Sequence, residues 1–183
     1  MGKVYVFLAD GFEEIEGLTV VDLLRRAGVE TVTVSVMKEL LICGAHGIKV
    51  YADAMFADLD YSDGDMLVLP GGMPGTTNLG THAGLCELLR RYASEGKRIS
   101  AICAAPSVLG QNGLLEGKQA TCYPGFEGEL KGAVYTAGRV AADGTVITGK
   151  GPGTAIDFGL AIITALRGEK TAKAISDALQ YMA

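Results

Sequence analysis

Short apolar runs alternate with amphipathic segments along most of this chain. Continuous apolar runs, bounded by glycine, proline or acidic residues, predict buried strands at 4–8, 31–36, 66–69 and 99–102. Apolar positions spaced three or four residues apart predict helices at 14–27, 84–94, 151–166 and 171–182. Because strands and helices alternate, the pattern predicts an α/β sandwich with a mostly parallel sheet and helices on both faces.

Two regions depart from this alternation. Residues 40–56 alternate loosely and contain two glycines, which predicts a short hairpin. Residues 118–149 predict short strands and turns, with Asp143-Gly144 as a hairpin turn. No repeat, low-complexity tract or linker interrupts the chain, so we expect a single domain over 1–183.

Composition and charge narrow the range of partners. The 183 residues are 49% hydrophobic, enough for a substantial core, and the formal net charge is −5. A negative chain with scattered lysine and arginine is poorly suited to nucleic acid or to an anionic membrane surface. We expect no signal peptide, and no apolar run reaches the roughly 18 residues that a membrane span requires.

The number and spacing of cysteines and histidines indicate the cellular compartment of the protein and whether it binds a metal. Four cysteines, Cys43, Cys86, Cys103 and Cys122, are widely spaced without a C-x-x-C pair, which predicts reduced thiols and a cytoplasmic setting. Two histidines lie far apart, and no glycine-rich turn carries the Gly-Lys-Ser/Thr ending of a phosphate loop. We therefore expect no metal and no other cofactor.

Cys103 is the strongest candidate for chemistry. The apolar strand 99–102 ends at this cysteine, and Pro106 suits the first turn of a following helix. A cysteine at such a corner has the placement of a nucleophile elbow. Outward backbone amides and the positive end of the helix dipole would favour a reactive thiolate.

Three glutamates, Glu13, Glu14 and Glu16, lie at or just before the start of the predicted helix 14–27, and periodicity only partly separates them. The helix dipole favours acidic residues in a first turn, which explains Glu14, and Glu14 lies on the polar side of the helix. Glu16 lies on the apolar side, where a carboxyl group is costly unless it is paired or protonated. Glu13 falls in the same half, so both Glu13 and Glu16 remain candidates for a functional acid.

A glycine turn follows the strand 66–69. In Leu-Pro-Gly-Gly, the amides of Gly71 and Gly72 can approach a ligand closely and, with the amide of Ala104, form an oxyanion hole. Most Gly-Gly turns are only turns, so this signal is weak by itself.

The remaining cysteines and histidines have simpler interpretations. Cys86 lies among leucines of a predicted helix and is expected in the core, whereas Cys43 is expected near the surface. Cys122 ends a short predicted strand, from which it could approach the site. His46 and His82 are expected to be exposed, and neither forms an obvious dyad with Cys103.

These motifs together resemble the ThiJ/PfpI superfamily. They are Glu16, the Leu-Pro-Gly-Gly turn, Ala-Ile-Cys-Ala-Ala-Pro around Cys103, and Gly-Pro-Gly-Thr-Ala-Ile-Asp-Phe-Gly-Leu, which follow one another in the same order over 4–166. The chain is most similar to the branch that contains the Parkinson-disease-associated protein deglycase. The resemblance implies a flavodoxin-like homodimer in which Cys103 is the reactive residue and Glu16 is its hydrogen-bonding acid.

The resemblance also implies two functions. One is conversion of α-oxoaldehydes or early glycation adducts, free or on protein, as a glutathione-independent glyoxalase or deglycase. The other is an oxidative-stress sensor or redox-regulated chaperone in which Cys103 is oxidised to the sulfinic acid. Gly71, Gly72 and Ala104 would bind an oxygen in either case.

Two positions depart from the patterns of the superfamily. Protease-like members carry histidine directly after the nucleophile, where this chain has Ala104, so peptidase activity is not expected. The deglycase has a histidine in the loop after the next strand, and the matching position here is Tyr123. Proton transfer would then depend on Glu16, with Tyr123 as a candidate hydrogen-bond donor.

Overall fold

A seven-stranded sheet organises the structure, a computed structural model that describes residues 2–181. The order across the sheet is β10-β11-β7-β6-β1-β2-β5, and every neighbouring pair is parallel except β10 and β11. The strands are β1 (Lys3–Leu8), β2 (Glu30–Ser35), β5 (Ala54–Met55), β6 (Met66–Leu69), β7 (Arg98–Ile102), β10 (Val140–Asp143) and β11 (Val146–Gly149).

Two small sheets lie outside the main one. The antiparallel hairpin joins β3 (Leu41–Cys43) to β4 (Lys49–Tyr51), as expected for 40–56. A short parallel pair joins β8 (Gln119–Ala120) to β9 (Val134–Tyr135).

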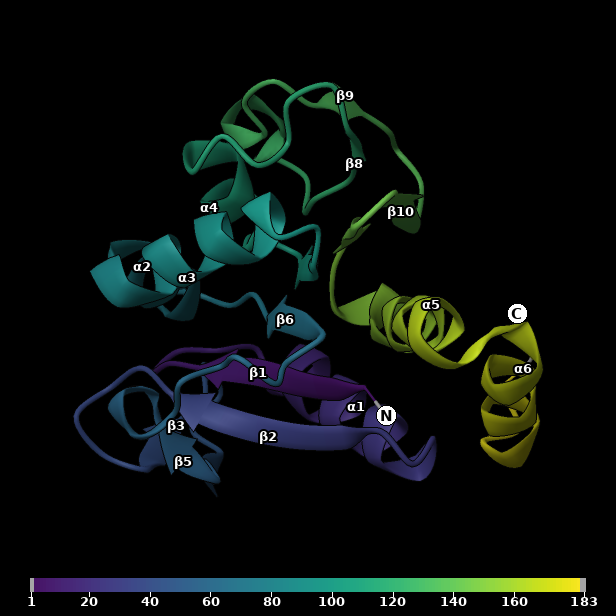
Figure 1. Cartoon of the computed structure of the whole chain (residues 1–183), viewed down its shortest axis with the longest axis horizontal. Helices are drawn as coiled ribbons and strands as arrows, with labels where there is room; N and C mark the ends of the chain where they lie inside the picture. The colour runs from purple at the N-terminus through teal and green to yellow at the C-terminus, as the bar shows by residue number, and fades with distance from the viewer. Residues whose placement is uncertain (1, 182–183) are drawn as a thin grey trace.

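Helices cover both faces of the main sheet (Figure 1). One group comprises α1 (Glu14–Arg26), α5 (Ala155–Arg167) and α6 (Glu169–Ala178); the other comprises α2 (Gly75–Thr81), α3 (Ala83–Ser94) and α4 (Pro106–Gln111). Single turns of 3-10 helix, η1 (Phe56–Asp58), η2 (Glu127–Glu129) and η3 (Pro152–Thr154), complete the described elements. The predicted parallel sheet with helices on both faces is confirmed.

The apolar run of strand β1 is continuous because both faces of the strand are buried. Tyr5 and Phe7 belong to the core cluster that contains the leucines of α3, whereas Val4 and Val6 belong to the cluster that contains the apolar side chains of α1 and α5. Successive side chains point to opposite faces of a strand, and both faces are covered here.

Some predicted boundaries differ from the structure. Helix α2 was not predicted, because its sequence Gly-Thr-Thr-Asn-Leu-Gly-Thr has little apolar periodicity. The last helix starts at Glu169 and ends at Ala178, earlier than the predicted 171–182; residue 182 lies outside the described range. The helix predicted from 151 begins as the 3-10 turn η3, and the regular helix α5 follows.

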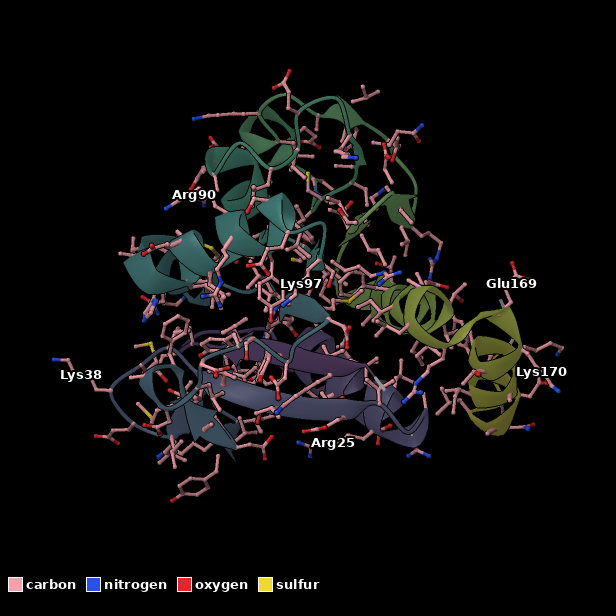
Figure 2. All side chains as sticks on the ribbon, in the orientation of Figure 1. Arg25, Lys38, Arg90, Lys97, Glu169 and Lys170 are labelled. Atoms are coloured by element: carbon pink, nitrogen blue, oxygen red, sulfur yellow. The ribbon has the colours of Figure 1, made fainter. Side chains whose placement is uncertain are left out.

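The surface carries the scattered charges. Figure 2 shows labelled charged side chains such as Lys38, Arg90 and Lys170 extending from the ribbon, and all three are exposed. Within residues 2–181, no helix combines the length and the apolar character needed to cross a membrane.

The sheet topology brings three segments to one edge. The parallel strands β1, β6 and β7 are neighbours, so their carboxyl ends lie together. The segments that leave these ends are the loop into α1, the turn at Gly71-Gly72, and Cys103. Ligands of open α/β sheets bind at this edge.

Candidate active site

Cys103 occupies the sharp bend between β7 and α4. Its φ angle is 66°, in the left-handed region that few residues other than glycine adopt, and its amide donates to the carbonyl of Gly149 at 3.0 Å. A left-handed conformation costs a residue with a Cβ about 1–2 kcal/mol. The side chain is only 9% exposed. The structure therefore has the strained bend expected of an elbow, with Pro106 in the first turn of α4.

Glu16 lies across from this bend and is fully buried. Its Oε2 accepts a hydrogen bond from the Gly71 amide at 2.8 Å. Gly71 lies between the two functional side chains: a Cβ added there would lie 2.6 Å from Cys103 Cβ and 2.7 Å from Glu16 Oε2. Only a residue without a side chain fits this position, so the turn allows Glu16 to face the thiol.

The Cys103 thiol does not have the lowered pKa expected from the sequence. Burial, the negative charge of Glu16 and the hydrogen bond to Glu16 raise its pKa to about 12, although the amides of Ala104 and Gly72 act in the opposite direction. Helix α4 has only six residues, and its dipole cannot outweigh burial beside a carboxyl group. The expectation that backbone amides and the helix dipole favour a thiolate is therefore not met, because burial beside Glu16 raises the pKa of the thiol.

The pKa of Glu16 is also raised, but it stays near neutral pH. Burial raises the pKa of Glu16 to about 7, and hydrogen bonds from Cys103 and the Gly71 amide limit the rise. At neutral pH the resting pair is therefore a thiol that donates to a partly ionised carboxylate. A carboxyl group with a pKa near the working pH is suited to accept and return a proton.

Two backbone amides face the sulfur. The N–H groups of Ala104 and Gly72 lie near the sulfur and act to lower the pKa of the Cys103 thiol. Gly72 has a φ of 89°, a conformation that glycine adopts readily. The Gly71 N–H, expected as a third donor, is instead occupied by Glu16. Two donors are thus available to bind an oxygen that develops next to the sulfur.

Tyr123 lies beside the elbow, and Cys122 points away from it. The Tyr123 amide donates to the Cys103 carbonyl at 2.9 Å, and its side chain is 46% exposed. Cys122 is buried in the core cluster that contains Ala105 and Leu109, whereas Cys103 packs in the cluster on the other face. The approach of Cys122 to the site, which its sequence position allowed, is not seen.

Glu14 is buried, which its place on the polar side of the helix did not predict. Its Oε1 accepts from the His46 amide at 2.8 Å, and its Oε2 lies 2.9 Å from His46 Nδ1. Burial acts to raise the pKa of Glu14, but His46 and backbone amides outweigh it and lower the pKa. Glu14 therefore holds the β3–β4 hairpin to the start of α1.

His46 also approaches Glu13, and these three residues form a candidate cation site. Its Nδ1 lies 3.5 Å from Glu13 Oε2, and the ligand atoms of Glu13, Glu14 and His46 all lie within 4.8 Å of one another. Carboxylates and imidazole are common ligands for divalent metals. The spacing of histidines in the sequence could not reveal this group, because His46 comes from the β3–β4 hairpin whereas Glu13 and Glu14 lie at the start of α1.

The other predicted positions have structural roles. His82 caps α3 by accepting from the Leu85 amide at 3.0 Å. Cys86 is buried, as expected for a core residue, and Cys43 is partly exposed.

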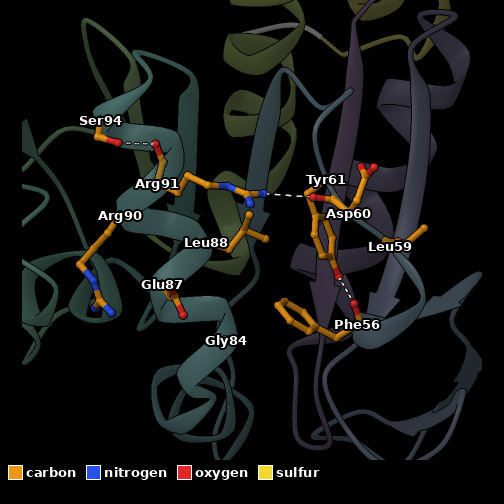
Figure 3. Close-up of a pocket in the computed structure, with 10 residues that line it drawn as sticks. All are labelled: Phe56, Leu59, Asp60, Tyr61, Gly84, Glu87, Leu88, Arg90, Arg91 and Ser94. Atoms are coloured by element: carbon orange, nitrogen blue, oxygen red, sulfur yellow. Dashed lines mark hydrogen bonds between the residues drawn. The ribbon is translucent and has the colours of Figure 1, made fainter.

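A cavity of about 750 Å³ lies away from these residues, between the segment 56–61 and helix α3. Figure 3 shows Arg91 reaching the backbone of Asp60, and Tyr61 hydrogen-bonded to the Phe56 carbonyl. None of the residues that line this cavity belongs to the Cys103 site.

A sequence model described as the DJ-1/PfpI family matches residues 2–165. The chain belongs to the DJ-1/PfpI family. The resemblance inferred from the motifs is thereby confirmed.

Several DJ-1/PfpI relatives match most of this chain. Protein DJ-1 homolog B of Arabidopsis thaliana is 37% identical over 179 residues, which cover 97% of this chain and 41% of the Arabidopsis protein. The chain thus spans less than half the length of that relative. The glutathione-independent glyoxalase DJR-1.2 of Caenorhabditis elegans is 35% identical over 162 residues, covering 87% of this chain and 86% of that protein.

The structure of oxidized DJ-1 from Toxoplasma gondii shares the fold. It matches with a TM-score of 0.96 and 36% sequence identity, and the match covers 100% of each chain. The DJ-1/PfpI chain described here therefore has the predicted flavodoxin-like α/β fold.

Proposed function

We propose that this DJ-1/PfpI protein converts 2-oxoaldehydes to 2-hydroxy acids without glutathione, through a covalent adduct on Cys103. The observation that carries the proposal is the buried Glu16 carboxyl group facing the thiol, with a pKa of about 7. The C. elegans relative named a glutathione-independent glyoxalase supports the same chemistry.

The first step joins the sulfur to the aldehyde carbon. The Glu16 carboxylate takes the thiol proton as the carbon–sulfur bond forms, and the electron pair of the carbonyl moves to its oxygen. The N–H groups of Gly72 and Ala104 bind that oxygen, because they already face the sulfur. Return of the proton from Glu16 to the oxygen completes a hemithioacetal.

The second step is an internal oxidation and reduction. Glu16 removes the hydrogen of the former aldehyde carbon as a proton, and an enediol forms. A proton is then delivered to the neighbouring carbon, which is reduced from ketone to alcohol, while the sulfur-bearing carbon becomes a thioester. Water cleaves the carbon–sulfur bond, and the 2-hydroxy acid and the Cys103 thiol are released.

Lactate formation from methylglyoxal tests this proposal. Cys103→Ser should abolish turnover, whereas Cys43→Ser, which alters a partly exposed cysteine of the hairpin, should retain it. Early glycation adducts release or present the same carbonyl carbon, so they form a second class of substrate for the same assay. A wild-type protein that forms no lactate would contradict the proposal.

Oxidation of Cys103 is a second candidate function, in which the protein acts as an oxidative-stress sensor or redox-regulated chaperone. It is favoured by the two amides beside the sulfur, which can bind the oxygens of a sulfinate as well as those of an aldehyde. Two peroxide molecules would each transfer one oxygen atom to the sulfur and leave as water. Mass spectrometry should then find two added oxygens on Cys103; equal oxidation of Cys43 and Cys86 would argue against a tuned site.

We propose further that the chain forms a homodimer through an apolar face. Exposed Ile15 and Leu18 lie on α1, and exposed Ile48 and Tyr51 lie on the β3–β4 hairpin. The two elements are joined by the hydrogen bond from the Ile48 amide to Glu14. Large exposed apolar side chains on adjacent elements are typical of an interaction surface. Light scattering should give a dimer mass, and Ile48→Glu should shift it toward monomer.

A reducing compartment such as the cytoplasm suits this chemistry. The four cysteines are free, and the proposed adduct requires Cys103 in its reduced form. Non-reducing mass spectrometry of protein taken from its native cells should therefore find no disulfide.

A further inference from the structure

Glu13, Glu14 and His46 bring three metal-ligating atoms together where the β3–β4 hairpin meets the start of α1. His46 Nδ1 lies 2.9 Å from Glu14 Oε2 and 3.5 Å from Glu13 Oε2, and one ligand atom of each residue lies within 4.8 Å of the other two. Ligand atoms about 2.0–2.2 Å from a tetrahedral zinc ion are about 3.3–3.6 Å from one another. The three atoms therefore have nearly the spacing that a divalent ion requires.

One ring nitrogen cannot satisfy both carboxylates. The 2.9 Å between His46 Nδ1 and Glu14 is a hydrogen-bond distance, and a ring nitrogen carries at most one hydrogen. The 3.5 Å to Glu13 exceeds the usual N–H···O range of about 2.7–3.2 Å, yet among residues 2–181 it is the only ionic contact of Glu13. The Glu13 side chain is 12% exposed, and a mostly buried carboxylate without a close partner is costly. A cation between the three groups would satisfy it.

Backbone amides of the hairpin hold Glu14 in the orientation of a metal ligand. Its Oε1 accepts from the amides of His46 at 2.8 Å and Ile48 at 3.3 Å, which leaves Oε2 to face the His46 ring. A Cβ at Gly44 would overlap the Glu14 carboxylate, so this glycine leaves the room that the carboxylate occupies. Groups that hydrogen-bond a metal ligand fix its direction and strengthen metal binding. Because Glu14 is already fixed, binding an ion requires little further ordering.

The donor set and its exposure favour a transition-metal ion such as zinc. The imidazole nitrogen of His46 suits zinc, copper, iron and nickel, whereas magnesium and calcium prefer sites made only of oxygen atoms. Two carboxylates beside a neutral imidazole carry a double negative charge, which a divalent ion neutralises. The His46 side chain is 67% exposed, so an ion can enter from solvent and keep a water molecule as its fourth ligand.

We propose that Glu13, Glu14 and His46 bind one divalent transition-metal ion per chain, with zinc as the preferred type, and that this ion holds the β3–β4 hairpin to the start of α1. The ligands come from both elements, since His46 lies in the hairpin whereas Glu13 and Glu14 lie at the first turn of α1. An ion that binds only the folded chain stabilises it. The inference does not depend on the chemistry proposed for Cys103.

Titration of the Cys103→Ser protein with zinc tests the site, because this background removes the thiol that could compete for the ion. Isothermal titration calorimetry should give one zinc ion per chain, and saturating zinc should raise the Tm. Substituting a ligand by His46→Gln or Glu13→Gln should weaken zinc binding at least about tenfold. The matched controls are His82→Asn, which keeps a capping side chain on α3, and Glu39→Gln, at an exposed carboxyl group. Both controls should bind zinc as tightly as the Cys103→Ser protein.

The absorption spectrum of cobalt(II) bound in place of zinc identifies the ligands. Nitrogen and oxygen ligands should give weak visible bands, which His46→Gln and Glu13→Gln should remove. A strong near-ultraviolet thiolate band would place the ion on a cysteine and overturn the site. Zinc that does not bind at micromolar concentration, or that binds equally well after both substitutions, would overturn it too. None of these measurements uses an aldehyde, so the site and the proposed glyoxalase function can fail separately.

Discussion

Glu16 and Cys103 affect each other's proton affinity in opposite directions. Burial and the Glu16 carboxylate both raise the pKa of the thiol. The thiol, in contrast, lowers the pKa of Glu16 because it hydrogen-bonds to the ionised carboxylate. The resting form at neutral pH is thus a thiol beside a carboxyl group that is only partly ionised. Reactivity in this pair comes from proton transfer during attack, since a free thiolate is not held beforehand.

The first prediction concerns the pH dependence of turnover. Because Glu16 must be ionised to take the thiol proton, kcat/KM for methylglyoxal should rise with pH and level off above the Glu16 pKa of about 7. Glu16→Gln should lower kcat/KM by roughly 100-fold or more, the size of a general-base contribution, and remove the rise. A wild-type profile that is flat from pH 6 to pH 8 would show that Glu16 is not the base.

The second prediction concerns stability. The pKa of Glu16 rises from 4.5 to about 7 on folding, so its protonated form favours the folded state. The stability it contributes is complete below the unfolded pKa and is lost as pH rises through the folded pKa, a loss of about 3 kcal/mol.

Urea denaturation of Glu16→Gln and the wild type at several pH values measures this loss. The glutamine variant cannot ionise, so its free energy of unfolding relative to the wild type should increase between about pH 4.5 and 7. A difference that is independent of pH would mean that the carboxyl group keeps its ordinary pKa in the folded protein.

The third prediction concerns the glycine between the two side chains. Gly71→Ala would place a methyl group 2.6 Å from Cys103 Cβ and 2.7 Å from Glu16 Oε2, so the side chains must move apart. We expect a loss of about 1–3 kcal/mol in unfolding free energy and slower alkylation of Cys103 by iodoacetamide. Gly153→Ala is the control, because a Cβ there meets nothing within 4 Å. Equal behaviour of the two variants would contradict this tight placement.

The fourth prediction concerns the backbone of Cys103. At a φ of 66°, glycine avoids the steric cost of a Cβ, so Cys103→Gly should be about 1 kcal/mol more stable than Cys103→Ala. The same comparison at Cys86, inside helix α3, should have the opposite sign, because glycine is the poorer helix former. Thermal or urea unfolding of the four variants measures both differences.

Local sequence patterns predicted the strands that carry the site more reliably than the segments around them. Strand β6 has the predicted bounds, and the bend at Cys103 follows from an apolar run that ends before Pro106. Helix α2 escaped prediction because it is held by backbone contacts to the Gly72 turn and to Gly11, with little apolar periodicity of its own.

The sequence by itself determined the alternation of strands and helices and the position of Cys103 at a corner, because these follow from the spacing of apolar residues and from the local geometry of proline and glycine. Only the tertiary structure decided that Glu14 holds the hairpin, that Glu16 faces the thiol, and that the pKa of Cys103 is raised. Burial and contact between distant segments set these properties, since desolvation and hydrogen bonding depend on which groups the fold brings together.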